Sequence, residues 1–320
     1  MTTAVPAVRN AVRAWLEQYE AGDRVLVAVS GGADSLALAH ALSVESKEFA
    51  ISLIGITVDH QLQEQSAAQA DRVVEQLGSF GVDCLVETVV VDLKDGLEAS
   101  ARRARYAALE KTALNKNAVV VFLGHTQNDQ AETVLLGLAR GSGTRSLSGM
   151  AGRSGLYVRP LLELTRLQSE QYCNELDLKF WKDPHNDNPD FMRVRVRNEV
   201  LPVLEKSIGP GISDALARSA QLLRDDADAL DGWAERESTE LDLSDLECSY
   251  LESLPRAIRT RLIRSAIYAA GAPSGTVTME HVGGVDALIC AWSGQGALNL
   301  PGGVKVERIS GRLSLSQHRP

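Results

Sequence analysis

The residues best suited to chemistry lie in one short loop, residues 29–35, which reads VSGGADS. Its two glycines permit positive φ angles and let backbone N–H groups approach anionic oxygens. Such N–H groups, together with the N-terminus of a following helix, form a binding site for phosphate. Ser30 and Ser35 add hydroxyl donors. Because an acid repels phosphate unless it holds Mg²⁺ or a cationic substrate, Asp34 is the candidate for one of those two roles.

The loop differs from the two commonest phosphate-binding motifs. It lacks the Gly-Lys-Ser/Thr ending of a Walker A loop and the GxGxxG spacing of a dinucleotide loop. A plain strand–turn–helix connection is the alternative, but it leaves the coincidence of Gly-Gly, an acid and flanking hydroxyls unexplained. The residues predicted to bind a nucleotide, in this loop and after the next strand, are Ser30, Gly31, Gly32, Ala33, Asp34, Ser35, Asp59 and His60.

The segments around the loop alternate between strand and helix. The apolar runs typical of buried parallel strands lie at residues 25–29, 51–58, 85–91 and 119–123. Helical segments separate or follow them at residues 34–42, 66–77, 97–115 and 129–140. This order predicts an α/β domain with a doubly wound parallel sheet, whose ligands bind beyond the carboxyl ends of the strands. Asp59 and His60 end the second strand there, and a polar strand-end pair without a ligand is an equal alternative.

The second half of the chain has a different pattern. The expected order is a glycine-rich loop at 141–155, a helix opening at Pro160, a turn cluster at 183–190 and a helix at 191–206 broken near Pro202. The IGPG segment at 208–211 is the expected boundary between a catalytic domain, residues 1–210, and an accessory domain, residues 211–320. The second domain is predicted to be smaller and mostly helical, with a hairpin at its end.

Composition excludes several classes of protein. The chain has 320 residues, of which 44% are hydrophobic and 23% charged, as in an ordinary soluble protein of about two domains. Its apolar runs are far shorter than the roughly 20 residues of a membrane helix, and it begins without a signal-peptide core. Its four cysteines are widely spaced, which argues against zinc and iron–sulfur sites. We therefore expect a cytoplasmic protein with reduced thiols and no membrane partner.

The loop resembles the SGGxDS loop of the PP-loop ATP pyrophosphatases, a superfamily with a Rossmann-like sheet that cleaves ATP between its α and β phosphates. Six further segments resemble, in order, those of the tRNA(Ile)-lysidine synthetases in their short form. They read VDHQLQEQS, ARRARY, GHTQNDQAETVLLGLARGSG, RPLLELTR, WKDPHNDNPDFMRVRVRNEVLP and GALNLPGGVKVER, and the matches extend from about residue 25 to residue 315. The positions that depart from the family pattern are Gln61, Gln63, Thr126, Asn128 and Val194.

The resemblance implies a two-step reaction that uses ATP and Mg²⁺. ATP would first adenylate the C2 carbonyl oxygen of the wobble cytidine in tRNA(Ile) with a CAU anticodon, releasing pyrophosphate. The ε-amine of free L-lysine would then displace AMP to give lysidine. The modified tRNA would carry isoleucine instead of methionine and read AUA instead of AUG.

The resemblance also suggests roles for individual residues. The expected catalytic residues are Asp34, His125, Asp129 and Glu132, with Asp34 as the metal ligand. Those expected to bind lysine are Asp34 and Glu132, for the ε-ammonium, and Arg102 or Arg105, for the carboxylate. A structural histidine at 125 and a solvated arginine face on the helix are the alternatives.

An RNA substrate requires local positive charge. The arginines expected to contact tRNA are Arg140, Arg145, Arg193, Arg195, Arg197, Arg259 and Arg261. A net charge of −9 argues against such a partner, but residues 214–252 hold twelve acids and three bases and so carry all of it. We expect that stretch to face away from the RNA. A homodimer is one candidate assembly.

Two rival functions remain open from the sequence. A tRNA thiolase would share the ATP chemistry, but it usually needs a catalytic cysteine or a CxxC cluster, and the four cysteines lie outside the segments above. A nucleotide-binding regulatory protein without turnover is the other, and the presence of Asp34, Arg105 and Glu132 opposes it.

Overall fold

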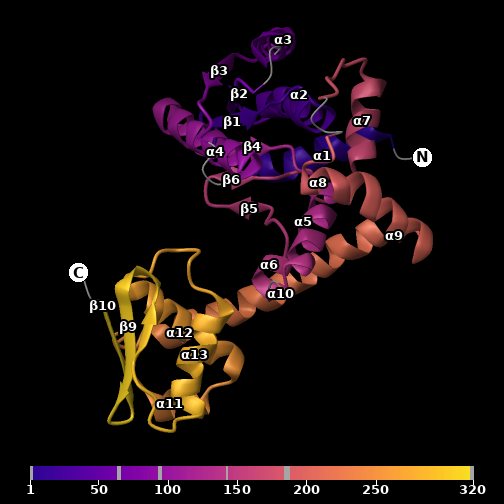
Figure 1. The fold of residues 1–320 in the computed structure, drawn as a ribbon. Coiled ribbons are helices and arrows are strands. Elements are labelled where there is room, and N and C mark those ends of the chain that lie inside the picture. The colour runs from indigo at the N-terminus through magenta and orange to yellow at the C-terminus, as the bar shows by residue number, and fades with distance from the viewer. Residues whose placement is uncertain (1–2, 63–65, 93–95, 142, 184–187, 318–320) are drawn as a thin grey trace. The chain divides into compact units, whose positions relative to one another are not determined.

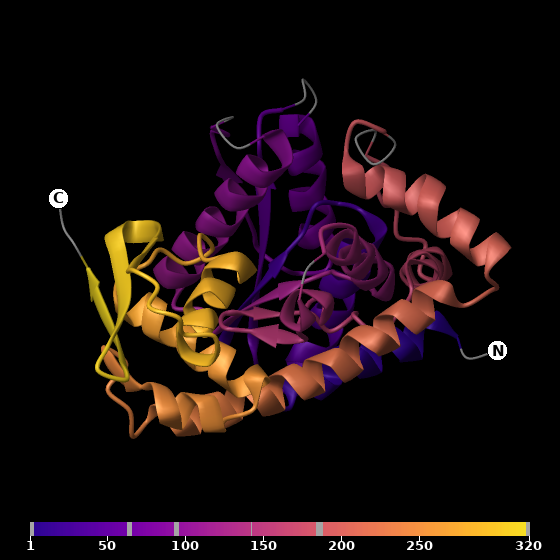
Figure 2. The same cartoon turned by 60° about the horizontal axis from the view of Figure 1, so that its bottom comes forward.

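The computed structural model describes residues 3–62, 66–92, 96–141, 143–183 and 188–317. The chain forms two compact units, Met1–Leu223 and Arg224–Pro320. The division falls inside helix α10 (Ile212–Ser238), thirteen residues after the boundary expected at 210, and Figure 2 shows that helix as continuous. None of the described helices is both long and apolar enough to span a membrane.

A six-stranded sheet forms the centre of the first unit, in the order β3-β2-β1-β4-β6-β5 (Figure 1). Five strands are parallel, and only β5 runs antiparallel, against β6. The strands are β1 (Arg24–Ala28), β2 (Ser52–Asp59), β3 (Cys84–Thr88), β4 (Val120–Leu123), β5 (Arg153–Ser154) and β6 (Tyr157–Val158). The first four confirm the predicted strands to within a few residues.

Helices cover both faces of this sheet. Val25 and Val27 of β1 lie in one hydrophobic core with α1 (Ala4–Leu16), α2 (Ala33–Glu48), α3 (Ser66–Ser79) and α7 (Arg166–Glu175). Leu26 and Ala28 point the other way, into a second core with α4 (Leu97–Lys116). This alternation follows from the two-residue period of a strand. The sheet is therefore doubly wound, as predicted.

Two local predictions in the first unit were wrong. The helix expected to open at Pro160 begins at Arg166, because Thr165 and Gln168 form a capping box there. The helix expected to break near Pro202 continues from Met192 to Ser207, through α8 (Met192–Arg195), a π-helical segment (Val196–Val200) and α9 (Leu201–Ser207). The π-helical turn ends two residues before Pro202, so the hydrogen-bond pattern changes directly before the proline and the helix continues past it. Two short helices complete this unit: α5 (Gln127–Ala139) and α6 (Thr144–Leu147).

The second unit packs helices against a small antiparallel sheet. Its helices after α10 are α11 (Cys248–Ser253), α12 (Arg256–Ala269) and α13 (Met279–Cys290). The predicted terminal hairpin is β9 (Val304–Ile309) with β10 (Arg312–Gln317), and β7 (Asp245–Glu247) and β8 (Leu298–Leu300) extend it to the order β7-β10-β9-β8. The tight turn between β8 and β9 depends on Gly302, whose φ is +77° and whose added Cβ would lie 2.7 Å from Pro273 Cδ.

Candidate active site

The glycine loop connects β1 to α2 at the carboxyl end of the sheet. Gly31 has a φ of +86°, a conformation that other residues rarely adopt, and a Cβ there would displace the Gln69 side chain, so the position favours glycine. Ser35 Oγ accepts from Ser30 N at 3.2 Å and donates to Gly32 O at 3.0 Å. The Ser35 hydroxyl therefore shapes the loop, whereas the Ser30 side chain is exposed and faces the space where a ligand would bind.

A close backbone approach brings a second loop to the start of α2. A Cβ on Gly124, which follows β4, would lie 3.0 Å from the carbonyl carbon and oxygen of Asp34. The residues after Gly124 are His125 and the first turn of α5, which contains Asp129. Gly124 is therefore what allows the predicted catalytic groups of the two loops to lie together.

A third segment passes over the glycine loop. Trp181 N donates to Gly31 O at 2.8 Å, and the side chain of Gln76 on α3 donates to Lys179 O. In a trans peptide the C=O and the next N–H point in opposite directions. The bond from Trp181 therefore directs Gly32 N–H away from that segment. Sequence reasoning noticed the WKDP segment but gave Trp181 no role.

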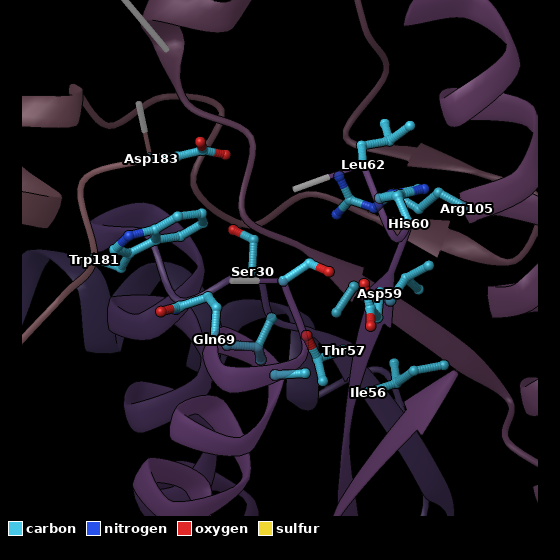
Figure 3. Close-up of a pocket in the computed structure, with 15 residues that line it drawn as sticks. Ser30, Ile56, Thr57, Asp59, His60, Leu62, Gln69, Arg105, Trp181 and Asp183 are labelled. Atoms are coloured by element: carbon cyan, nitrogen blue, oxygen red, sulfur yellow. The ribbon is translucent and has the colours of Figure 1, made fainter. Parts of the chain in front are cut away.

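Two adjoining cavities open at this edge of the sheet. The smaller, which we call the strand-edge cavity, has a volume of about 170 Å³ and is lined by the end of β2, by α3 and by Trp181 (Figure 3). The larger, which we call the polar cavity, has a volume of about 630 Å³ and is lined by the glycine loop, His125, Asp129 and a set of arginines. Ser30, Arg105, Trp181 and Asp183 line both. The predicted site residues Asp59 and His60 line only the strand-edge cavity.

Asp59 and His60 lie where β2 ends and the next turn begins. Asp59 is buried, and its Oδ1 accepts from Gln61 N at 2.8 Å. This turn holds Gln61 at a φ of +54°, in the region that favours glycine, which the family pattern has at this position. His60 Nδ1 is buried without a hydrogen-bond partner among the described residues. Burial, with the nearby charge of Arg105, lowers the pKa of His60, so its imidazole is neutral at pH 7.

A series of alternating charges lines the polar cavity and ends at Glu132, which is not among the lining residues. Arg166 lies between Asp34 (Nε–Oδ2 3.3 Å) and Asp129 (Nη2–Oδ1 3.4 Å). Arg197 lies between Asp129 (Nη2–Oδ1 3.6 Å) and Glu132, which it binds with two hydrogen bonds of 2.6 and 3.0 Å. The Glu132 side chain is fully buried. This series of charges thus contains three acids and two bases.

The pKa values of Asp34 and Asp129 shift in opposite directions. Burial raises the pKa of Asp34 to about 6, against the opposing charge of Arg166, and the charge of Asp129 adds to the increase. Burial would also raise the pKa of Asp129, but Arg166, His125 and the N–H of Thr126 outweigh it and bring that pKa below its usual value. Thr126 N donates to Asp129 Oδ2 at 2.8 Å. Asp34 Oδ1 is buried without a partner among the described residues.

His125 and the predicted lysine-binding arginines surround the same cavity. Burial is the main cause that lowers the pKa of His125 to about 3, so its imidazole is neutral at pH 7. Its Nδ1 is buried without a partner among the residues described. Arg102 and Arg105 both line the polar cavity, whereas Arg103 does not and donates to Ser100 Oγ at 3.1 Å. The structure therefore brings both predicted candidates for the lysine carboxylate to the site.

The predicted tRNA-binding arginines have different environments. Arg140 and Arg145 are exposed, and Arg193 lines the polar cavity. Arg195 donates to the backbone oxygens of Pro189 and Asp190. The other three are held in ion pairs: Arg197 with Glu132, Arg259 with Asp286 (Nε–Oδ1 2.6 Å) and Arg261 with Asp231 (Nε–Oδ1 2.5 Å). Arg259 is also buried, so its placement favours a structural role in the second unit.

Comparisons with known proteins identify the family of the chain. The PP-loop domain model matches residues 6–204, and the model of the TilS substrate binding domain matches residues 246–314. A tRNA(Ile)-lysidine synthase from Thermobifida fusca is 50% identical over 98% of this chain and 97% of its own length. One from Streptomyces coelicolor is 52% identical over 92% of this chain and 85% of its own.

A solved structure has the same fold at low sequence identity. The U34-tRNA thiolase NcsA from Methanococcus maripaludis, with its [4Fe-4S] cluster, aligns with a TM-score of 0.58 at 19% identity, over 69% of this chain and 80% of its own. That likeness supports the fold alone. The family models and the near full-length identities go further: the chain belongs to the PP-loop family and, within it, to the tRNA(Ile)-lysidine synthases.

Proposed function

We propose that the protein uses ATP to join free lysine to C2 of the wobble cytidine of tRNA(Ile) with a CAU anticodon. The product, lysidine, would change codon reading from AUG to AUA and tRNA identity from methionine to isoleucine. One observation carries the proposal: a glycine loop built for phosphate lines one polar cavity together with Asp34, Arg166, Asp129 and Arg197. The protein is also about half identical to lysidine synthases over nearly its full length.

The first step is the activation of the cytidine. Its O2 atom attacks the α phosphorus of ATP, and the bond to the β phosphate breaks, which releases pyrophosphate. Gly32 N–H and the N-terminus of α2 are placed to bind phosphate oxygens, and Ser30 adds an exposed hydroxyl. The strand-edge cavity, with its mostly apolar walls, suits the adenosine.

The carboxylate of Asp34 fits a magnesium ion that is carried in by ATP. Its Oδ1 is buried without a partner among the described residues, while Oδ2 faces Arg166. No group of three potential metal ligands occurs in the described part of the chain. One carboxylate oxygen suffices when phosphates and water supply the other ligands of Mg²⁺. Bound there, the ion would neutralise charge on the phosphates.

The second step is the attack of lysine. The ε-ammonium first loses one proton. The resulting amine attacks C2 and loses a second proton as the C2–O2 bond breaks, and AMP leaves with that oxygen. Asp34 is the first candidate for the ε-ammonium of incoming lysine in this second step, as it is for Mg²⁺ in the first, because Arg197 already occupies Glu132. Arg102 and Arg105 remain the candidates for the carboxylate, which a guanidinium binds with two parallel hydrogen bonds. Glu132 then acts through Arg197, whose guanidinium it holds beside Asp129.

The same proposal implies the setting of the enzyme. A tRNA substrate places it in the cytoplasm. Arg140 and Arg145, which are exposed, and Arg193, which lines the polar cavity, remain candidates for RNA contacts; Arg197 lines the same cavity but is also bonded to Glu132. A homodimer stays a prediction.

Incorporation of labelled lysine tests the proposal. The full chain is mixed with ATP, Mg²⁺, radiolabelled lysine and transcripts of tRNA(Ile) with a CAU or a GAU anticodon. We expect ATP-dependent labelling of the CAU transcript alone. Binding of ATP without labelling would favour a regulatory protein, and ATP-dependent transfer of sulfur would favour a thiolase. All four cysteines are described, and none lines either cavity.

A further inference from the structure

A second basic pocket opens between α4 and the β5–β6 hairpin of the first unit. We call it the arginine pocket. It has a volume of about 540 Å³, and no acidic side chain of the described residues lines it. The side chains that matter to the argument are Arg102, Arg103, Arg159, Tyr106 and Tyr157. Because Arg102 lines both this pocket and the polar cavity, the two adjoin.

Arg159 is the unusual member of this pocket. It is only 7% exposed, yet no acidic group in the described part of the chain forms an ion pair with it. Its Nη1 donates to Ala151 O at 2.9 Å, and its Nε is buried without any hydrogen-bond partner among those residues. Burying a charge is costly unless an opposite charge compensates for it. Arg159 therefore lacks the anion that its environment requires.

The other walls of the pocket are held in place. The guanidinium of Arg102 lies 4.8 Å from the centre of the Tyr106 ring, and its Nη2 is 3.2 Å from the Tyr106 hydroxyl. The Tyr106 and Tyr157 rings meet edge to face at 4.8 Å. Tyr157 OH donates to Glu110 Oε1 at 3.1 Å, so that nearby carboxylate is already engaged. An anion entering the pocket meets oriented cations, which lowers the entropy lost on binding.

We propose that the arginine pocket binds a backbone phosphodiester of the RNA substrate, next to the cytidine held in the polar cavity. This inference rests on the proposed function. Arginine guanidinium groups match phosphate geometry with paired hydrogen bonds. The pocket adjoins the polar cavity through Arg102, as a strand continuing from the bound nucleotide requires. Free lysine has one carboxylate and would leave most of this pocket unfilled.

Binding of an anticodon stem-loop RNA to the full chain tests the proposal. Each phosphate flanking the cytidine is replaced in turn by an uncharged methylphosphonate. We expect Arg159→Gln to weaken RNA binding roughly tenfold, as the loss of a hydrogen bond to a charged group would. The slope of log K against log salt concentration is negative, and its magnitude should decrease by about one. One methylphosphonate should weaken binding to the unmodified protein, and should cost little further affinity in the variant.

Two more variants protect the test against misfolding. Arg103→Gln lies at the exposed rim and should weaken RNA binding by about threefold. Arg72→Gln, on the exposed face of α3, is the matched control and should change nothing. If Arg159→Gln does not fold, Arg103→Gln with the methylphosphonates decides the matter. ATP affinity should be equal in all the proteins that fold.

Two results would overturn the inference. One is unchanged RNA affinity in a folded Arg159→Gln protein, or, if that protein does not fold, in Arg103→Gln. The other is a raised KM for lysine with unchanged RNA affinity in these variants, which would show that the pocket binds lysine and not RNA. RNA binding is measured without ATP or lysine, so a chain that binds RNA through this pocket but makes no lysidine would refute the proposed function alone.

Discussion

Replacing Asp34 with asparagine tests whether the carboxylate at the start of α2 is kept at the expense of stability. Its side chain is 19% exposed, and burial raises its pKa from 3.8 to about 6. For an acid with a raised pKa, folding disfavours the ionised form, so the penalty is full above the folded pKa and disappears as the pH falls. The raised pKa of Asp34 therefore lowers the free energy of unfolding by about 3 kcal/mol at pH 7 and by about 1 kcal/mol at pH 4.5.

Asparagine keeps the shape of the side chain and removes the charge. We expect Asp34→Asn to raise the free energy of unfolding by about 1–3 kcal/mol at pH 7. Arg166 keeps its contact with Asp129 at 3.4 Å, so the variant should fold normally. Lysine incorporation should fall at least 100-fold, because the charge that holds the metal or ammonium is lost.

Urea unfolding at pH 7.5 and pH 4.5, with the activity assay beside it, measures both effects. The stability advantage of the variant should shrink at the lower pH, where the original carboxyl group is itself mostly neutral. Asp71→Asn, at an exposed position on α3, is the control and should show no such change. Destabilisation at pH 7.5, or an advantage that grows toward acid pH, would refute the reasoning.

Three further predictions concern contacts that hold the site and the second unit. Glu132→Gln should destabilise the first unit by about 2 kcal/mol in urea unfolding, because it removes the fully buried carboxylate that accepts two hydrogen bonds from Arg197. A double variant with Arg197→Met should recover part of that loss. Trp181→Pro should bind ATP about tenfold more weakly than Trp181→Ala in calorimetry, because only proline removes the N–H that donates to Gly31 O. Equal affinities would show that this hydrogen bond does not contribute to ATP binding. Arg259→Ala should lower the melting temperature by several degrees while tRNA affinity stays the same, because its guanidinium forms a buried ion pair; a selective loss of tRNA binding would restore its predicted role in RNA contact.

Most of the sheet could be predicted because the signals are local. Continuous apolar runs identify β1 to β4, and the glycine loop identifies the turn between β1 and α2. Strands β5 and β6 have two residues each, too few for a pattern to form. The helix start at Arg166 was missed because Pro160 is the commoner signal, while the capping side chain of Thr165 lies five residues further on.

The site was predictable in its members but not in its pairings. Asp34, Asp129 and Glu132 do lie around one cavity or directly behind it, as expected from strands that end at the same edge. Which arginine meets which acid depends on contacts between residues 34 and 166 and between residues 132 and 197, far apart in the chain. The sequence predicts Arg197 as an RNA contact and gives no sign of its two hydrogen bonds to Glu132. A motif shows that an arginine is present, but only the fold shows its partner.

The products of the complete reaction test the central claim most directly. The full chain, ATP, lysine and the CAU transcript are incubated together, and the tRNA is then digested to nucleosides and analysed by mass spectrometry. We predict that the wobble cytidine gains one lysine, with one AMP and one pyrophosphate formed for each lysine attached. An unmodified cytidine, a sulfur-containing nucleoside, or ADP and phosphate as the nucleotide products would contradict the account.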